Sequence, residues 1–320
     1  MRKRYDGVLI KGLPSFRVIN PFVMRGRNES AIYFSQTIEI ENTRKFLKQR
    51  NRSREPDERI SLFHVLLAAA VRTISLRPQL NRFISGQRIY QRNRLQVSFI
   101  VKKDIGDDGP ETNAKITFSP FDTLEEVRRR VTRDVNEARN LEGNVSDHEV
   151  DFFARLPRFL VNGVVKAFRF LDYFGVAPKG MIEIDPLYTS LYVANLGSVG
   201  LDAAYHHLYE WGNASVFMVI GRMHKALVLD EKNEPVTRLV IKIKYTMDDR
   251  ISEGIYAAKA LKLFKNFVQN PETLETFPEI SDEVLQELSL LLPEEEQHAS
   301  ETGSIFPEQS APSRSRSQDR

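Results

Sequence analysis

Two carboxylates and an arginine stand together where a predicted strand gives way to a predicted helix. These residues are Asp248, Asp249 and Arg250, and Glu253 and Gly254 follow them. A side chain that takes a proton from a reacting group works best when its pKa lies near the working pH. Aspartate has an ordinary pKa of about 3.9, so Asp249 would be a weak base at neutral pH unless burial raised that value.

The six histidines are the other side chains that could carry a proton near neutral pH. His206 and His207 are adjacent within Tyr205–Trp211, which is rich in aromatic residues, and such a pair could line a channel. On an extended segment we expect the two rings to point apart. No third ligand stands at the spacing of a metal site, so we expect no metal. Ordinary packing is the alternative role for both histidines.

Periodicity predicts the strand and the helix that would hold Asp249. Apolar and polar residues alternate over residues 239–246, which is the pattern of a half-buried strand. Over residues 257–268 the apolar residues recur at helical spacing instead. Ser252 is the expected N-cap of this helix. The acidic residues are therefore predicted to lie in a tight strand-to-helix turn.

Other segments have equally clear patterns. Ile60–Ser75 has one apolar face at helical spacing and is predicted to be a helix. Leu187–Asn195 is predicted to be a strand, and Leu196-Gly197-Ser198 follows it. Gln87–Tyr90 and Leu95–Lys102 are predicted to be strands that pair with each other.

The turn at Asp249 resembles a motif of the dihydrolipoyl acyltransferases, the core subunits of 2-oxoacid dehydrogenase complexes. The family motif is Asp-His-Arg-x-x-Asp-Gly, and this chain reads Asp248-Asp249-Arg250-Ile251-Ser252-Glu253-Gly254. Leu191-Tyr192-Val193-Ala194-Asn195-Leu196-Gly197 is similar to the family segment Phe-Thr-Ile-Ser-Asn-Leu-Gly. Asn20–Ser30 is similar to the first helix of the family. The resemblance covers residues 13–272 in one order of elements.

This resemblance implies an α/β fold of the chloramphenicol acetyltransferase type, with a mixed sheet flanked by helices. It implies a stand-alone acyltransferase-like catalytic-type domain over residues 1–272. Residues 273–320 become rich in Glu, Ser and Pro, and we expect a mostly disordered C-terminal tail there. Proteins of this fold are trimers with the site at the subunit boundary, so a homotrimer is implied.

The resemblance also implies a role for each matched residue. The catalytic histidine of the family falls on Asp249, and the serine that stabilises the oxyanion falls on Ala194, or on Val193 with a shift of one. Neither Ala194 nor Val193 has a hydroxyl that could donate to the oxyanion. Glu253 takes the place of a family aspartate that makes an ion pair, which here could involve Arg25 or Arg27. The other motif positions would keep a structural role, and they are Asp248, Arg250, Gly254, Asn195 and Gly197.

Loss of both chemical groups predicts a degenerate active site. We expect a homologue of the coenzyme A-dependent acyltransferases that acts as a binding or scaffold protein, a pseudoenzyme. It would require no cofactor and could hold coenzyme A or an acyl-CoA thioester as a ligand. The alternative is an active acyltransferase with a non-standard base, either Asp249 or the His206/His207 pair.

A further alternative is a peripheral membrane protein. Phe152–Phe174 is apolar with basic residues spaced along it, so it could lie on a membrane surface or pack against the core or a sister subunit.

Composition sets the remaining limits. The chain has 320 residues and a formal net charge of only +3, so total charge gives no sign of nucleic-acid binding. It has no cysteine, which excludes disulfides, thiolate catalysis and cysteine-ligated zinc. The basic residues at the start are not followed by an apolar stretch of the secretory type, so we expect a cytoplasmic protein.

Overall fold

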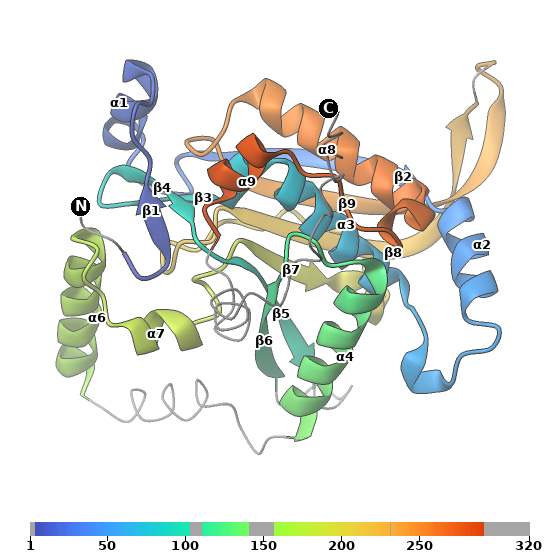
Figure 1. Ribbon diagram of the computed structural model, residues 1–320, viewed down its shortest axis with the longest axis horizontal. Coiled ribbons are helices and arrows are strands. Elements are labelled where there is room, and N and C mark those ends of the chain that lie inside the picture. Colours follow the sequence, from blue (N-terminus) through green and yellow to red (C-terminus); the bar gives the residue numbers. More distant parts are fainter. Residues whose placement is uncertain (1–3, 103–110, 141–156, 231, 291–320) are drawn as a thin grey trace, which may run out of the picture. The chain divides into compact units, whose positions relative to one another are not determined.

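The computed structural model describes residues 4–102, 111–140, 157–230 and 232–290, and the residues up to Ser289 form one unit (Figure 1). The strands are β1 (Gly7–Leu9), β2 (Ala31–Glu39), β3 (Arg82–Ser85), β4 (Arg88–Arg92), β5 (Leu95–Lys102), β6 (Glu111–Phe118), β7 (Leu191–Asn195), β8 (Val216–Leu229) and β9 (Pro235–Asp248). The helices are α1 (Ser15–Val23), α2 (Glu41–Arg50), α3 (Leu62–Leu76), α4 (Leu124–Asn140), α6 (Arg158–Tyr173), α7 (Lys179–Ile184), α8 (Gly254–Gln269) and α9 (Asp282–Leu288).

A six-stranded mixed sheet forms the centre of the unit, with the strand order β2-β9-β8-β7-β5-β6. The pairs β5–β7 and β7–β8 are parallel, and the other neighbours are antiparallel. A second sheet has the order β1-β4-β3. The predicted pairing of Gln87–Tyr90 with Leu95–Lys102 is therefore wrong. β4 pairs with β3 and β1, because β5 is already flanked by β6 and β7 in the larger sheet.

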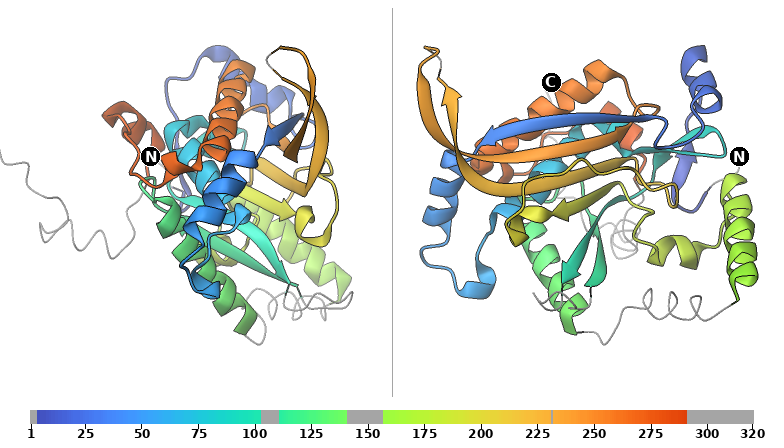
Figure 2. Two further views of the ribbon diagram at one scale, coloured as in Figure 1. Left: turned by 90° about the vertical axis from the view of Figure 1, so that its right-hand side faces the viewer. Right: turned by 180° about the vertical axis from the view of Figure 1, so that it is seen from behind.

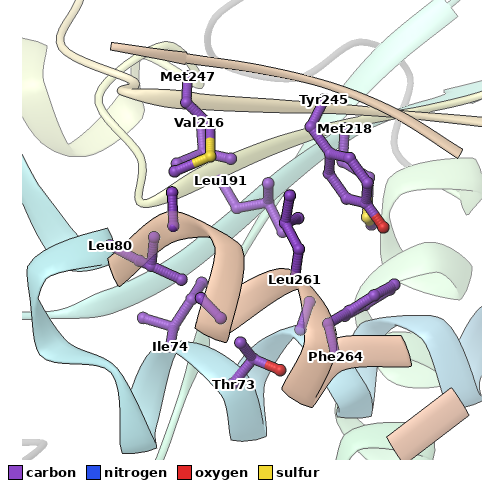
Figure 3. Close-up of a pocket in the computed structure, with 13 residues that line it drawn as sticks. Thr73, Ile74, Leu80, Leu191, Val216, Met218, Tyr245, Met247, Leu261 and Phe264 are labelled. Carbon is purple, nitrogen blue, oxygen red and sulfur yellow. The ribbon is translucent and has the colours of Figure 1, made fainter. Parts of the chain in front are cut away.

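Helices α3 and α8 cover one face of the large sheet, as both views in Figure 2 show. Strand residues such as Met218 and Tyr245 point toward Ile74 of α3 and Phe264 of α8 around a small apolar cavity of about 50 Å³ (Figure 3). Most of α3 is buried. By length and composition Pro56–Leu76 could cross a membrane, but 67% of its most apolar window is buried inside the fold. The segment is thus the central core helix that its apolar face predicted.

The opposite face of the sheet is covered by the irregular segment that follows β7. Tyr192, Phe217 and Val219 from neighbouring strands pack there with Ala203 and Leu208 of that segment. Successive side chains along a strand point to opposite faces of the sheet. Leu191 and Val216 therefore lie on the helix-covered face, and the next residues, Tyr192 and Phe217, lie on the opposite face. The candidate site residues lie on the segment-covered face and at the ends of its strands.

The first helix is shorter than predicted and begins earlier. The resemblance placed a helix at Asn20–Ser30, but α1 spans Ser15–Val23 and Met24 is extended. Residues 26–30 form a turn instead, in which the Ser30 hydroxyl donates to the Gly26 carbonyl at 2.7 Å. The Glu29 carboxylate accepts from the Gly26 backbone N–H at 3.3 Å in the same turn. These local side-chain bonds satisfy the backbone that a continued helix would have satisfied.

The compact unit extends past residue 272 to Ser289. α9 is tied to β3 through an ion pair between Glu287 and Arg82 at 2.7 Å. Within the predicted segment Phe152–Phe174, residues 152–156 lie outside the described residues, and the rest forms α6. α1 and α6 lie at the same end of the unit in both views, opposite the tip of the β8–β9 hairpin (Figures 1 and 2).

Candidate active site

The centre of the predicted motif is a buried ion pair at the end of β9. The Arg250 guanidinium donates to both carboxylate oxygens of Asp248, at 2.8 Å from Nε and 2.7 Å from Nη2. Both side chains are almost completely buried, with exposed fractions of 2% and 0%. Such a bidentate pair fixes geometry strongly. Asp248 and Arg250 therefore shape the turn, as the resemblance implied.

The same arginine attaches the turn to the loop after α1. Its Nη1 donates to the backbone carbonyls of Met24 at 2.8 Å and Arg25 at 3.1 Å. Beside it, the backbone N–H of Asp249 donates to the Ser30 carbonyl at 2.9 Å, which continues the pairing of β9 with β2. The loop at 24–30 and the motif turn are thus one hydrogen-bonded structure.

Asp249, the residue at the family histidine position, is partly exposed at the surface of this turn. Within the described part of the chain its carboxylate makes no hydrogen bond and no ion pair; only its backbone atoms do. A catalytic base is usually held in position by a third group. The structure thus places Asp249 at an accessible turn without such a support.

Glu253 makes an ion pair, but with another partner than predicted. It lies 3.7 Å from Arg17 of α1, and not against Arg25 or Arg27. Its side chain is 74% exposed, so this contact contributes little to stability. Ser252 is buried and is not the N-cap of α8, because Glu253 occupies the cap position and Gly254 begins the helix.

Ala194, at the family serine position, lies near the end of β7 and packs beside the cluster that covers this face. The three hydroxyls that precede it along the chain make structural hydrogen bonds. Thr189 donates to the Gln96 carbonyl at 2.9 Å, and the Ser190 hydroxyl accepts from the Gln96 N–H at 2.9 Å. The Tyr192 hydroxyl donates to an asparagine of β6 at 2.7 Å. None of these three groups replaces the missing serine.

Two further motif residues, Asn195 and Gly197, shape the chain after β7. Asn195 begins a 3₁₀ turn at Leu196–Val199. At Gly197 a Cβ atom would collide with the backbone carbonyl of Gly221, where β8 has an irregular register. Only glycine permits this close approach of two backbones. The structural role implied for Gly197 therefore has a direct steric cause.

Within one chain, Ala194 and Asp249 lie far apart. Ala194 pairs with Val219 of β8 across the sheet, and Val219 pairs with Lys244 of β9. Asp249 follows Lys244 by five positions, which corresponds to roughly 16 Å along an extended strand. The two side chains of one chain therefore cannot act on the same reacting atom.

His206 and His207 lie together on the covered face, and the prediction that their rings point apart is wrong. The ring centroids are 4.8 Å apart with planes at 15°, and His206 also stacks on Phe217 at 4.0 Å. The segment is not a regular strand, and each Nδ1 lies by the carbonyl of the next residue, at 2.7 Å and 2.9 Å. Because a carbonyl only accepts, each Nδ1 carries a hydrogen in this arrangement.

One feature near the motif had no signal in the sequence. Arg27 is buried, and its side chain lines a polar cavity of about 210 Å³ together with Arg250 and Glu210. These residues are distant in sequence and lack a recognisable spacing, so only the tertiary structure brings them together. Among the described residues no group of three or more histidine or acidic side chains could hold a metal ion.

The comparisons with known proteins agree with this geometry. Residues 188–276 match the family model of the 2-oxoacid dehydrogenases acyltransferase (catalytic domain). A probable dihydrolipoamide acetyltransferase from Listeria monocytogenes 4b F2365 is 13% identical with a TM-score of 0.54, over 82% of this chain and 95% of that chain. The dihydrolipoamide acetyltransferase of Azotobacter vinelandii is 12% identical with a TM-score of 0.55, over 83% and 93%. A chloramphenicol acetyltransferase is 14% identical with a TM-score of 0.49, over 82% and 98%. No curated protein matches the sequence.

The fold is therefore the mixed α/β fold of the dihydrolipoamide acetyltransferases, a mixed sheet flanked by helices as predicted. The resemblance to the catalytic domain of the 2-oxoacid dehydrogenase acyltransferases is likewise confirmed, by a family match that contains β7, β8, β9, α8 and the turn at Asp249.

Proposed function

We propose that this protein is an acyltransferase-type domain whose chemistry has been lost and which acts as a binding or scaffold protein. The proposal rests on the surroundings of the Asp249 carboxylate. A carboxylate stands on the partly exposed turn where the family has its histidine, and no described side chain orients it. In the Azotobacter vinelandii enzyme, a serine, a histidine and an asparagine were investigated for their role in the catalytic mechanism. The resemblance of the two sequence motifs assigns Asp249 and Ala194 to the histidine and serine positions.

The missing oxyanion donor adds to the missing base. Removing one such donor from an enzyme typically costs roughly 10²–10³ in rate. The hydroxyls of Thr189, Ser190 and Tyr192 tie β7 and the residues before it to β5 and β6, so using one of them would break a structural hydrogen bond. A protein that lacks both groups can still bind a thioester, because binding needs the channel and not the base.

We further propose a homotrimer in which coenzyme A or an acyl-CoA thioester is the ligand. The separation of Ala194 and Asp249 within one chain supports this assembly, since the two positions could face one ligand only if they came from different chains. Analytical ultracentrifugation of the full chain tests it directly. A monomer at micromolar concentration would contradict the proposal.

Acyl transfer from acetyl-CoA to dihydrolipoamide and to a panel of thiols and alcohols tests the loss of chemistry. The wild type should show no acyl-transfer turnover. The double variant Asp249→His/Ala194→Ser should gain turnover if the channel is intact. Asp249→Ala is the matched control and should equal the wild type. Turnover by the wild type that is lost in Asp249→Ala would show that the aspartate serves as the base, and would end the scaffold proposal.

A second candidate is an active acyltransferase that uses His206 as its base. The specific observation in its favour is the fixed tautomer, because Nδ1 faces the His207 carbonyl and leaves Nε2 free to accept a proton. Wild-type turnover that survives Asp249→Ala but is lost in His206→Gln would establish this mechanism. Loss in neither variant would remove both residues from consideration.

A third candidate is membrane association through α6. Phe159 and Phe170 are 74% and 64% exposed, and three basic residues, Arg158, Lys166 and Arg169, lie on the same helix. An amphipathic helix of this kind can insert its apolar face between anionic lipid headgroups. Co-sedimentation with anionic vesicles at low salt tests it, with Phe159→Ser/Phe170→Ser as the variant. Absence of binding by the wild type would exclude this function.

A further inference from the structure

A polar cavity of about 210 Å³ lies beside the motif turn, and its lining is strongly charged. Its walls come from the loop after α1, the turn between β3 and β4, the end of α6, the segment before β8 and the turn after β9. Six charged side chains line it, and they are Arg25, Arg27, Arg169, Arg250, Asp172 and Glu210.

The charge of Arg250 is neutralised by Asp248 at 2.7 Å. Asp172 shares Arg4 with Asp6, at 2.7 Å and 2.8 Å, so this group of three side chains keeps one negative charge. The other three arginines of the lining outweigh that charge and the carboxylate of Glu210, and the resulting excess of positive charge would attract an anion.

Arg27 is the most unusual member of this lining. It is 8% exposed, and no carboxylate in the described part of the chain lies within ion-pair distance of its guanidinium. Its side-chain hydrogen bonds go to the backbone carbonyls of Tyr209 at 3.1 Å, Trp211 at 3.3 Å and Ile84 at 3.5 Å, and its Nε has no protein partner among the residues described. Burial lowers the pKa of Arg27, yet a guanidinium remains charged at any physiological pH. A buried charge without a direct ion-pair partner is unfavourable.

The walls of the cavity are held in place by two glycines. Gly86 and Gly212 have φ of +55° and +73°, a region that favours glycine. A Cβ at Gly86 would collide with the Tyr173 carbonyl, and one at Gly212 would collide with the Leu187 carbonyl. The two loops are therefore pressed against their neighbours, and the cavity is formed before any ligand binds. Preorganisation of this kind lowers the cost of binding.

We propose that this cavity is a binding site for a compact oxyanion, either a phosphate group or a short dicarboxylate. Arg27 would contact the anion from the buried side, and Arg25 and Arg169 would contact it from the exposed side. Forked arginine donors match the geometry of both oxyanions. Because Arg250 belongs to the cavity wall and to the motif turn, an occupied cavity also stabilises that turn. The proposal does not depend on any acyl transfer.

Isothermal titration of the full chain with inorganic phosphate and with malonate tests the site, against chloride at the same ionic strength. Arg169→Gln is the diagnostic variant, because Arg169 is exposed and its loss leaves the fold unstrained. Arg158→Gln is the matched control, since it removes the same charge from the same helix but does not line the cavity. We expect binding of at least one anion, weakened about threefold to tenfold by Arg169→Gln and unchanged by Arg158→Gln.

Two results would overturn the proposal. One is no heat and no rise in melting temperature with either anion beyond the chloride control. The other is an equal loss of affinity in both variants, which would indicate general attraction to a basic helix. Preference between phosphate and malonate then identifies which oxyanion the cavity accepts. Arg27→Gln serves as a second variant if circular dichroism shows that it folds, and it should abolish binding.

Discussion

His64 should make this protein less stable in acid. At the start of α3 the Ser61 hydroxyl accepts from the backbone N–H of His64, and Nδ1 of His64 accepts from the backbone N–H of Ser61, both at 3.2 Å. Burial, together with the positive charge of Arg128, lowers the pKa of His64 from 6.5 to about 4. The ring is therefore neutral in the folded protein, as an Nδ1 that accepts a hydrogen bond requires.

The size of the effect follows from this difference in pKa. As the pH falls below 6.5 the unfolded chain protonates His64, while the folded protein does so only near pH 4. The unfolded state binds more protons in this window, so the free energy of unfolding falls as the pH falls. Each pKa unit corresponds to about 1.36 kcal/mol, which gives a loss of about 2 kcal/mol near pH 5 and about 3 kcal/mol near pH 4. Well below pH 4 both states are protonated, so further acidification adds little more from this residue.

The variant His64→Gln isolates the contribution. Glutamine does not titrate, and Ser-x-x-Gln still forms the reciprocal capping bonds. Urea unfolding of both proteins is measured at intervals from about pH 7 to about pH 4. Between neutral pH and about pH 5, the free energy of unfolding of the variant should rise by about 2 kcal/mol relative to that of the wild type. Carboxylates common to both proteins cancel in this difference. His224→Gln on the β8–β9 hairpin is the control. Parallel curves for wild type and His64→Gln would refute a His64 that stays neutral in the folded protein.

Two further predictions concern stability. Asp248→Asn leaves the buried Arg250 without its ion-pair partner and should lower the free energy of unfolding by about 3–5 kcal/mol. Arg222→Met breaks an exposed ion pair and should lower it by less than about 1 kcal/mol. Equal losses in urea unfolding would contradict the structural role assigned to Asp248 and Arg250. Gly197→Ala forces a methyl group against a carbonyl of β8 and should cost about 1–3 kcal/mol, while Gly180→Ala in α7, where a Cβ meets nothing within 4 Å, should be neutral or slightly stabilising. Melting temperatures compare the two, and a neutral Gly197→Ala would show that the two backbones can separate at no cost.

Patterns within single segments were predictable from the sequence. The helix at α3 and the strand–turn–helix around Asp249 follow from periodicities of two and 3.6 residues, which depend only on neighbours along the chain. The resemblance to the acyltransferases rested on the same turn and on β7, and the family match covers both. The roles implied for Asp249 and Ala194 stay predictions, because they depend on activity and not on fold.

Predictions about pairing and partners fared less well. β4 pairs with β3 and β1 because of how the two sheets divide the strands, which a local pattern does not contain. Glu253 meets Arg17 because α1 is displaced toward the N-terminus relative to the predicted helix. The stacking of His206 and His207 depends on hydrogen bonds between each ring and the next carbonyl, which override the alternation expected of a strand.

The sequence by itself determined the identity of the motif turn, its place between a strand and a helix, and the absence of a histidine at position 249 and of a serine at position 194. Only the tertiary structure decided that Asp249 and Ala194 lie far apart in one chain, and that Arg27, Arg169 and Arg250 surround one charged cavity. The physical reason is the range of the interactions. Hydrophobic periodicity acts over a few residues, whereas buried charges and strand pairing depend on groups that are distant in sequence and meet only in the folded chain.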